Sequence, residues 1–313
     1  MKQLLCARSN YNERLLFRAN TNVMASLNYK GMAVSGRVII FLLLLNSILL
    51  PLNSQIKGFD KIRWEKERIA PGLVWKSAHT IVEDTIPQNI NILIVNLHKR
   101  RISILYNPGK NVLTSKQASD AGAISAVNAG FFNIKEGGSV TYIRTGGKIM
   151  DSDTAKKWPK NANLNGALAN EKGKHLTIME AKNNDWFDAH TEYDDILVTG
   201  PVLILDKKKV ILPKTSLVTT KHPRSCVGVI NGHKLVLVTL DGRTAEAHGM
   251  SLTELADLMK SLKCKDALNL DGGGSTTMWI RNKPFNGVVN MPCDNKKFDH
   301  EGERAVSDIL IIK

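Results

Sequence analysis

The chain has 313 residues, 43% of them hydrophobic, so it is long enough to bury at least one large core. That composition excludes an intrinsically disordered protein, and a count of four cysteines excludes a small scaffold held together by disulfides. The net charge of +14 favours anionic partners, although charge alone does not separate phosphorylated glycans or envelope polymers from nucleic acids or anionic membranes.

The N-terminal segment contains an apolar run at residues 38–50, which has the length of a signal-peptide core and is short for a membrane-spanning helix. We therefore interpret residues 1–55 as a leader with a signal peptide, and our hypothesis places its true start at Met32. The predicted product is exported to the periplasm, the cell surface or the medium. The alternative is a protein that stays anchored in the membrane by residues 38–50.

Residues 56–120 predict a short β-rich extension ahead of the main domain. Residues 91–97 and 101–106 are apolar or alternating runs on either side of a basic turn, which is the pattern of a β-hairpin. We expect this hairpin to join the main sheet.

Two further β-rich runs each end in an aspartate. Residues 234–240 lead into Asp241, and residues 267–270 lead into Asp271. We expect these two strands to share one sheet with the runs at residues 276–280 and 305–312.

A helix is predicted between the two aspartates. Ser251 and Glu254 form a capping box, and the apolar residues of 252–262 fall on one helical face. A strand–helix–strand order is typical of neighbouring parallel strands, so Asp241 and Asp271 are expected at the same edge of the sheet.

Three consecutive glycines follow Asp271 in residues 271–277, named the glycine loop from here on. Glycine is a poor residue for extending a strand, so three in a row indicate that something approaches this backbone closely. Amide and hydroxyl donors beside one carboxylate suit a ligand with phosphate and sugar oxygens. A tight hairpin with a surface aspartate would produce the same local pattern.

Five sequence blocks, in order along residues 121–313, resemble the phosphodiester glycosidase family. The blocks are Asn128-Ala129-Gly130-Phe131-Phe132, Gly200-Pro201, His222 to Gly228, Asp241-Gly242-Arg243 and Asn269 to Ser275, and a closing Gly302 to Val306 also fits. Three places depart from the family pattern: Cys226, Lys263 where a helix-ending glycine is usual, and Ser307-Asp308 where a small or amide pair is common. Together with the strand pattern, the resemblance implies an α+β fold with a twisted mixed β-sheet core and few helices, as a single catalytic domain over 121–313.

The resemblance also implies a reaction, the hydrolysis of the glycosidic C–O bond of a sugar-1-phosphodiester such as a GlcNAc-1-phosphodiester. Free sugar and a phosphomonoester would be released. Because the leaving phosphate is already a stable anion, cations that hold it matter more than a strong general acid. We predict Arg224 as the first phosphate clamp and Arg243 as the second. Asp271 and Asp241 are the candidates for stabiliser, nucleophile or base, and the sequence does not divide these roles.

The predicted substrate-binding residues surround these catalytic candidates Asp271, Asp241 and Arg224. They are Asn128, Gly130, Phe132, His222, Arg243, Gly272, Gly273, Gly274 and Ser275. Several also have a plain structural interpretation: Asp241-Gly242 is a common turn pair, Arg224 can serve a salt bridge, and Phe132 can be a core residue.

Two other functions fit the same residues. In a metal-dependent phosphodiesterase, Asp241 and Asp271 would hold a divalent cation and the P–O bond would break. In a noncatalytic module, the same pocket would only bind an envelope glycan. The one cofactor considered is therefore a divalent cation near Asp271. The expected partner is a phosphorylated glycan or envelope polymer, with no nucleic acid, and with membrane contact only through an uncleaved N-terminal segment.

Three cysteines lie outside the leader, Cys226, Cys264 and Cys293, and their spacing matches no zinc site. A Cys264–Cys293 disulfide is an alternative to three buried thiols.

Overall fold

The structure is a computed structural model that describes residues 58–82, 85–152 and 163–313. The predicted leader, with its apolar run and the Met32 start, lies outside these residues. Within the described part of the chain, no helix is both long enough and apolar enough to cross a membrane.

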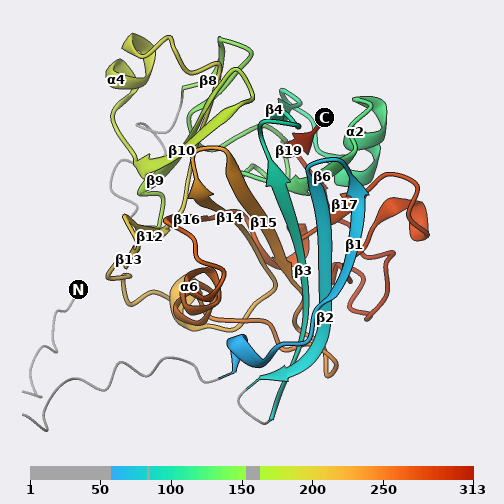
Figure 1. The fold of residues 1–313 in the computed structure, drawn as a ribbon. Coiled ribbons are helices and arrows are strands. Elements are labelled where there is room, and N and C mark those ends of the chain that lie inside the picture. The colour runs from blue at the N-terminus through green and yellow to red at the C-terminus, as the bar shows by residue number, and fades with distance from the viewer. Residues whose placement is uncertain (1–57, 83–84, 153–162) are drawn as a thin grey trace, which may run out of the picture. The chain divides into compact units, whose positions relative to one another are not determined.

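The largest sheet has eight strands, and every ladder in it is antiparallel (Figure 1). In spatial order they are β1 (Glu65–Ala70), β2 (Leu73–Val82), β3 (Ile86–Asn96), β15 (Lys234–Leu240), β14 (Arg224–Asn231), β16 (Asp266–Asn269), β12 (Val202–Leu205) and β13 (Lys208–Lys209). The strands of the predicted extension therefore join the main sheet directly, because β3 pairs along its length with β15.

Smaller sheets complete the β core. The five-stranded sheet contains β10 (His175–Glu180), β9 (Gly166–Glu171), β11 (Asp195–Thr199), β7 (Ile143–Thr145) and β8 (Lys148–Asp151). The four-stranded sheet contains β17 (Met278–Ile280), β6 (Ser125–Asn128), β19 (Asp308–Ile312) and β4 (Ile102–Tyr106), while β18 (Ala305–Val306) pairs with β5 (Val112–Leu113). The α-helices are α2 (Thr114–Asp120), α4 (Asn184–Ala189), α5 (Ser216–Thr219) and α6 (Leu252–Ser261), and single 3-10 turns are η1 (Phe59–Lys61), η2 (Gly273–Ser275) and η3 (Phe285–Gly287).

The eight-stranded sheet separates two hydrophobic cores, and β15 shows how. Its residues alternate, so that Leu235 and Leu237 belong to the first core and Val236 and Val238 to the second. Apolar residues of both smaller sheets, for example Leu310 of β19, complete the first core. Both faces of β15 are therefore buried, which explains its continuous apolar sequence.

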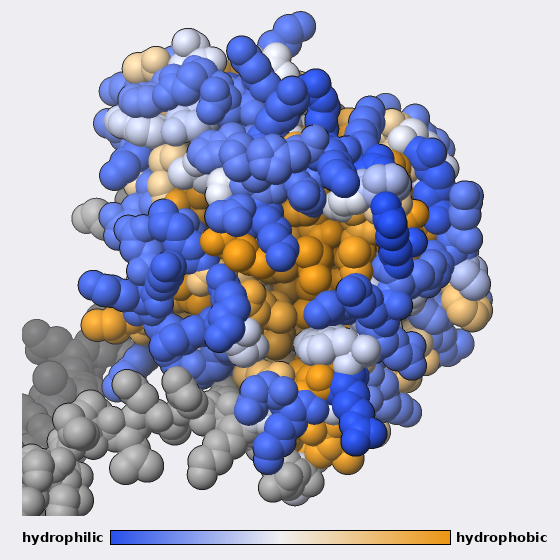
Figure 2. Space-filling view, viewed as in Figure 1, coloured by the Kyte–Doolittle hydropathy of each residue, from blue (hydrophilic) through white to orange (hydrophobic). Residues whose placement is uncertain are grey.

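Helix α6 covers the second core and confirms the predicted capping box. The Ser251 hydroxyl accepts from the Glu254 amide at 3.3 Å, and the Glu254 carboxylate accepts from the Ser251 amide at 2.6 Å. Lys263 ends the helix region in the left-handed conformation, with φ of 64°, at a position where glycine is the usual residue. The helix does not cover this whole face, because apolar surface remains beside it over the sheet (Figure 2), and Ile94 and Ile230 are among the partly buried residues there.

The expected hairpin at 91–97 and 101–106 is wrong. Both runs are strands, but β3 pairs with β2 and β15, whereas β4 pairs with β19 of another sheet. The turn between them therefore carries the chain from one sheet to the next. Local alternation identifies a strand, whereas its partners depend on distant residues.

Two expectations about the Asp-bearing strands also need correction. The runs at 276–280 and 305–312 do not share a sheet with β15 and β16, because β17 and β19 lie in the four-stranded sheet. β15 and β16 do run in the same direction, yet β14 lies between them and is antiparallel to both. Their C-terminal ends still reach the same edge.

The cysteines of the described residues are Cys226, Cys264 and Cys293, and all three are buried free thiols. The alternative of a Cys264–Cys293 disulfide is therefore wrong for this structure.

We predict that Leu237→Ala lowers the free energy of unfolding by about 3 kcal/mol, because it opens a cavity at a fully buried position of a central strand. Urea denaturation measures the change. Ile211→Ala is the control, since Ile211 is 97% exposed and its loss should change stability by less than about 0.5 kcal/mol. Equal effects of the two substitutions would contradict the assigned core.

Candidate active site

One edge of the eight-stranded sheet brings the predicted catalytic residues together. β14 begins at Arg224, while its neighbours β15 and β16 end just before Asp241 and Asp271. In the ladders Arg224 lies opposite Leu240, and Asn269 lies opposite Cys226. Three chain segments that are distant in sequence therefore leave the sheet side by side.

Asn128, at the end of β6, ties the glycine loop to this edge. Its side-chain amide donates to the carbonyl of Asp271 at 2.6 Å, and its side-chain oxygen accepts from the Thr277 amide at 3.1 Å. The same oxygen accepts from the Ser225 hydroxyl of β14 at 2.6 Å. Asn128 is fully buried, and its side chain holds both ends of the glycine loop. The side chain that the sequence assigned to substrate is therefore bonded to the protein itself.

The glycines of the loop are required by close neighbours. The Gly273 amide donates to the Pro223 carbonyl at 2.9 Å, and a Cβ on Gly272 would lie only 2.7 Å from that same oxygen. Gly273 also has φ of +63°, in the left-handed region that favours glycine. The close approach predicted from the glycine run is confirmed, and Pro223 of the same chain is one of the groups that approach.

Two guanidinium groups border the other side of the glycines. A Cβ on Gly273 would lie 2.9 Å from Nη2 of Arg243, and one on Gly274 would collide with Nη2 of Arg304. Gly272 and Gly273 are half-buried, and Arg243 is exposed. The loop therefore presents bare main chain next to two cations at the surface.

Asp271 is the less buried of the two predicted catalytic aspartates. It is half-buried, and its Oδ1 accepts from the Gly272 amide at 3.0 Å. Burial raises the pKa of Asp271 to about 7, opposed by the neighbouring Ser275 hydroxyl and the Gly272 amide, while the charge of Asp308 raises it further and that of Arg304 lowers it. This carboxyl can therefore gain or lose a proton near neutral pH.

Asp308, at the start of β19, is a further buried acid whose charge acts on Asp271, and it is not among the residues predicted from sequence. Its carboxylate accepts from the Gly130 amide at 2.5 Å and from the Ser307 hydroxyl at 2.9 Å. Only 1% of the residue is exposed, and burial raises its pKa to about 6. Gly130 was predicted to bind substrate, but its amide donates to the Asp308 carboxylate.

Asp241 reaches the loop through an asparagine. Its Oδ1 accepts from the Asn290 side chain at 2.8 Å, and its Oδ2 accepts from the Asn89 side chain at 2.6 Å and the Met291 amide at 3.0 Å. The same Asn290 amide also donates to the Thr276 carbonyl at 3.0 Å. Burial raises the pKa of Asp241 to about 6, against these three donors. With 1% exposure, Asp241 braces the loop from behind.

Arg224 is buried and its donors are largely occupied. Nε donates to the Met250 carbonyl at 2.8 Å, and Nη2 donates to the Leu217 and Thr220 carbonyls at 2.8 and 2.6 Å. Burial, together with the charge of Arg243, lowers its pKa to about 10. The fork that the sequence assigned to phosphate oxygens thus binds main-chain carbonyls around α5.

Arg243 and His222 form a pair at the surface. Nε of Arg243 donates to Nδ1 of His222 at 3.3 Å. Burial, with the charges of Arg224 and Arg243, lowers the pKa of His222, so its imidazole stays neutral and accepts this bond. The second predicted clamp is therefore exposed and is oriented by a histidine.

Arg304 adds a cation that the sequence analysis did not select, although it lies in the closing family block. Its Nη2 contacts Oδ1 of Asp294 at 2.5 Å, and 27% of its side chain is exposed. This ion pair raises the pKa of Arg304 and holds the guanidinium over Gly274.

Two other predicted residues take different places. Phe132 is 9% exposed and packs in a core cluster with Trp279 and Ile309, so it does not form a pocket wall. Ser275 is 1% exposed and lies in η2 beside Asp271.

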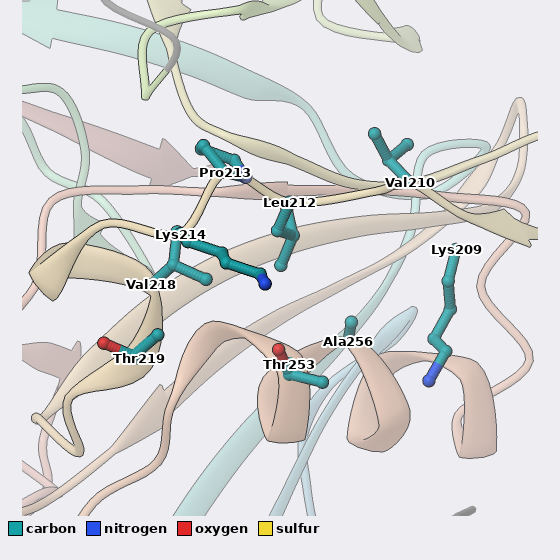
Figure 3. Close-up of a pocket in the computed structure, with 9 residues that line it drawn as sticks. All are labelled: Lys209, Val210, Leu212, Pro213, Lys214, Val218, Thr219, Thr253 and Ala256. Atoms are coloured by element: carbon teal, nitrogen blue, oxygen red, sulfur yellow. The ribbon is translucent and has the colours of Figure 1, made fainter. Parts of the chain in front are cut away.

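A separate pocket lies between β13, α5 and α6 (Figure 3). It is lined by Lys209, Val210, Leu212, Pro213, Lys214, Val218, Thr219, Thr253 and Ala256. Lys214 points into the space between Leu212 and Thr253 (Figure 3). None of the predicted site residues lines it.

The phosphodiesterase alternative requires side chains that can hold a divalent cation. In residues 58–82, 85–152 and 163–313, His, Cys, Asp and Glu do not gather in threes or larger groups that could hold a metal ion. Both carboxylate oxygens of Asp241 accept hydrogen bonds from side-chain amides. The acid whose charge acts on Asp271 is Asp308, not Asp241.

The sequence carried a signal for only some of the residues that were missed. Asp308 is an acid inside the apolar run from Val306 to Ile312, and a buried charge in a strand marks a special site. Asn290 had no such signal, because an asparagine after two valines is ordinary at a strand end.

The predicted domain is similar to known proteins over its whole length. The phosphodiester glycosidase family model matches residues 121–313. The SPbeta prophage-derived uncharacterized protein YomE of Bacillus subtilis (strain 168) is 33% identical over 119 residues. That match covers 36% of this chain and 16% of YomE, so the aligned part is a small share of the relative's length.

Solved structures share the fold. The catalytic domain of zebrafish N-acetylglucosamine-1-phosphodiester alpha-N-acetylglucosaminidase, auto-inhibited by its pro-peptide, has a TM-score of 0.62 and 22% identity, over 80% of this chain and 87% of that one. A hypothetical protein from Synechocystis has a TM-score of 0.62 and 14% identity, over 80% of this chain and 63% of that one. The predicted α+β fold, mostly sheet with few helices, is confirmed.

We predict that Asp241→Asn lowers the free energy of unfolding by about 1–3 kcal/mol, because an amide donor would then face one of three converging donors. Urea denaturation measures it. Asp120→Asn is the control, since that side chain is 63% exposed and should change stability by less than about 0.5 kcal/mol. Unchanged stability of Asp241→Asn would refute the bracing role.

A second prediction concerns pH. The pKa of Asp271 is higher in the folded chain, so the folded state holds this proton more tightly than the unfolded state. Its contribution to stability is complete below the unfolded pKa of about 4 and is lost as pH rises through about 7. We expect Asp271→Asn to lose less stability than the unchanged protein between pH 4.5 and 8, as followed by urea unfolding. Identical losses would show that Asp271 titrates normally.

Proposed function

The chain belongs to the phosphodiester glycosidase family, and we propose that it hydrolyses the glycosidic C–O bond of a sugar-1-phosphodiester. The observation that carries this proposal is the half-buried Asp271 carboxyl next to bare glycine main chain, with Arg243 and Arg304 alongside. The zebrafish enzyme with the same fold is named for N-acetylglucosamine-1-phosphodiesters. A GlcNAc-1-phosphodiester is therefore our first substrate, and free sugar and a phosphomonoester are the proposed products.

The two surface guanidiniums support the phosphate half of the substrate. The leaving group is a phosphate monoester, so the protein needs fixed positive charge more than it needs a proton donor. A guanidinium fork matches two phosphate oxygens. Arg243 borders Gly273 and contacts the His222 imidazole, Arg304 borders Gly274 and pairs with Asp294, and Arg224 is bound to carbonyls and contributes its charge from behind.

Asp271 supports the sugar half. The transition state at the anomeric carbon resembles an oxocarbenium ion, which a nearby carboxylate stabilises or attacks. Asp271 is the predicted acid that solvent reaches, while both oxygens of Asp241 are bound by amides. We therefore assign the reacting role to Asp271 and the positioning role to Asp241.

The cellular setting is part of the same proposal. Residues 1–55 would direct export, with anchoring by 38–50 as the alternative. A phosphorylated glycan or envelope polymer would be the natural substrate, and the chain's positive charge would attract it. We expect no nucleic-acid partner.

We predict turnover of a GlcNAc-1-phosphodiester in 18O-labelled water, with the label in the released sugar, because water attacks the anomeric carbon. Asp271→Asn should lower kcat by about 10²- to 10⁴-fold, since the carboxylate acts at the reacting atom. Label in the phosphate, together with inhibition by a chelator, would support the metal-dependent phosphodiesterase. Binding without turnover would support the noncatalytic module.

A further prediction separates phosphate binding from chemistry. Arg243→Gln should raise KM about tenfold, because it removes a charged donor from the phosphate, and should also weaken inhibition by inorganic phosphate. Arg68→Gln is the control, since Arg68 is an exposed residue of the edge strand β1. If both variants behave alike, Arg243 is not the clamp.

A further inference from the structure

We propose that the pocket between β13, α5 and α6 is a second ligand site, and that it binds a short-chain monocarboxylate. The pocket has a volume of about 220 Å³, and neither Asp271 nor any residue of the glycine loop lines it. It does not belong to the proposed catalytic machinery, so this site goes beyond the function proposed above.

Five apolar side chains line the pocket and provide a surface for a hydrocarbon chain. They come from the segment after β13 and from the facing helices, and they are Val210, Leu212, Pro213, Val218 and Ala256. A dry cavity of about 150 Å³ holds a molecule of six carbon atoms, so this pocket has room for about nine non-hydrogen atoms. Hexanoate, with a carboxylate on a short alkyl chain, has this size.

The charge in the pocket selects an anion. Two lysines line it, and Nζ of Lys209 is already paired with Oδ1 of Asp257 at 2.6 Å. In the described part of the chain no acid lies within ion-pair distance of Lys214, and its side chain points into the space between Leu212 and Thr253 (Figure 3). The pocket therefore contains one uncompensated positive charge.

A single ammonium beside a hydroxyl matches a carboxylate. Of the two threonines in the lining, Thr219 donates its hydroxyl to the Thr215 carbonyl at 3.1 Å. We therefore assign the ligand's oxygens to Lys214 and Thr253, whose charge-assisted and neutral hydrogen bonds suit a monoanion. A phosphate dianion would bring a second negative charge for which this pocket offers no further unpaired lysine.

The pocket is formed before any ligand arrives, because Arg224 joins its helical walls. Nη2 of Arg224 donates to the carbonyls of Leu217 and Thr220, which flank the two pocket-lining residues of α5. Nε of the same guanidinium donates to the Met250 carbonyl, directly before the N-cap of α6. Walls that are already ordered cost the ligand little on binding, which favours a small molecule.

The experiment is an NMR titration of the full chain, labelled with 15N, with sodium hexanoate. We expect saturable shifts of the amide signals of Val218, Thr219 and Thr253, with a Kd of about 1 mM, as is usual for a ligand of this size. The signals of Gly272 to Gly274 should stay in place, which separates this pocket from the cations of the active site. Shifts at the glycine loop alone, or no saturable shift at all, would overturn the proposal.

Lys214→Gln should raise the Kd for hexanoate about tenfold, because it removes the charge and keeps a long polar side chain. Lys208→Gln is the matched control, since Lys208 is an exposed residue of β13 that does not line the pocket, and its Kd should equal that of the unchanged protein. Both lysines are exposed, so folding is expected, and thermal unfolding checks it. Equal affinities of the two variants would contradict the role of Lys214 and overturn the proposal.

Two further probes test the two halves of the ligand. Acetate keeps the carboxylate without the chain, and hexan-1-ol keeps the chain without the charge, so each should bind about tenfold more weakly or worse. If either probe binds as tightly as hexanoate, or if inorganic phosphate binds more tightly at the same signals, the assigned ligand class is wrong. The titrations need no substrate, so a failure to cleave sugar phosphodiesters would count against the proposed function alone.

Discussion

The site depends on one buried asparagine that joins two sheets. Asn128 belongs to β6 of the four-stranded sheet, yet its side chain bonds Ser225 of β14 in the eight-stranded sheet and both ends of the glycine loop. Each of these groups is buried or partly buried, and losing a partner there costs about 1–3 kcal/mol. The junction therefore sets the position of the loop, and with it the position of Asp271.

Three aspartates lie near this junction, and each has its own set of hydrogen-bond donors. Asp241 is surrounded by amide donors, Asp308 receives a main-chain amide and a hydroxyl, and Asp271 is half-buried and receives the Gly272 amide. An isolated buried carboxylate is costly unless it is hydrogen-bonded or protonated. Asp271 and Asp308 each have one main-chain amide and one hydroxyl as donors, and Asp271 is the less buried residue of the two.

Local features of this chain were readable from sequence, and long-range pairings were not. The capping box of α6 and the strand character of β15 follow from neighbouring residues, and both were predicted. The glycine run predicted a close approach, but the groups that approach, Pro223 and Arg243, lie far away in the chain. The partner of β4, the insertion of β14 between β15 and β16, and the contact of Asp308 with Gly130 join residues far apart in the chain. Periodicity carries no information on such pairs, so the sequence predicts that a strand forms but not which strand it pairs with.

The arginines show the same division between local chemistry and placement. Sequence favours Arg224 because a guanidinium after His222-Pro223 suits a phosphate, but folding supplies three carbonyls that bind its Nε and Nη2 first. Its charge is still present, and it lowers the pKa of His222 together with burial and Arg243. A neutral His222 is what can accept the bond from Arg243. The charge of the buried arginine thus adds to burial, which is the larger cause, in favouring the neutral histidine that orients Arg243.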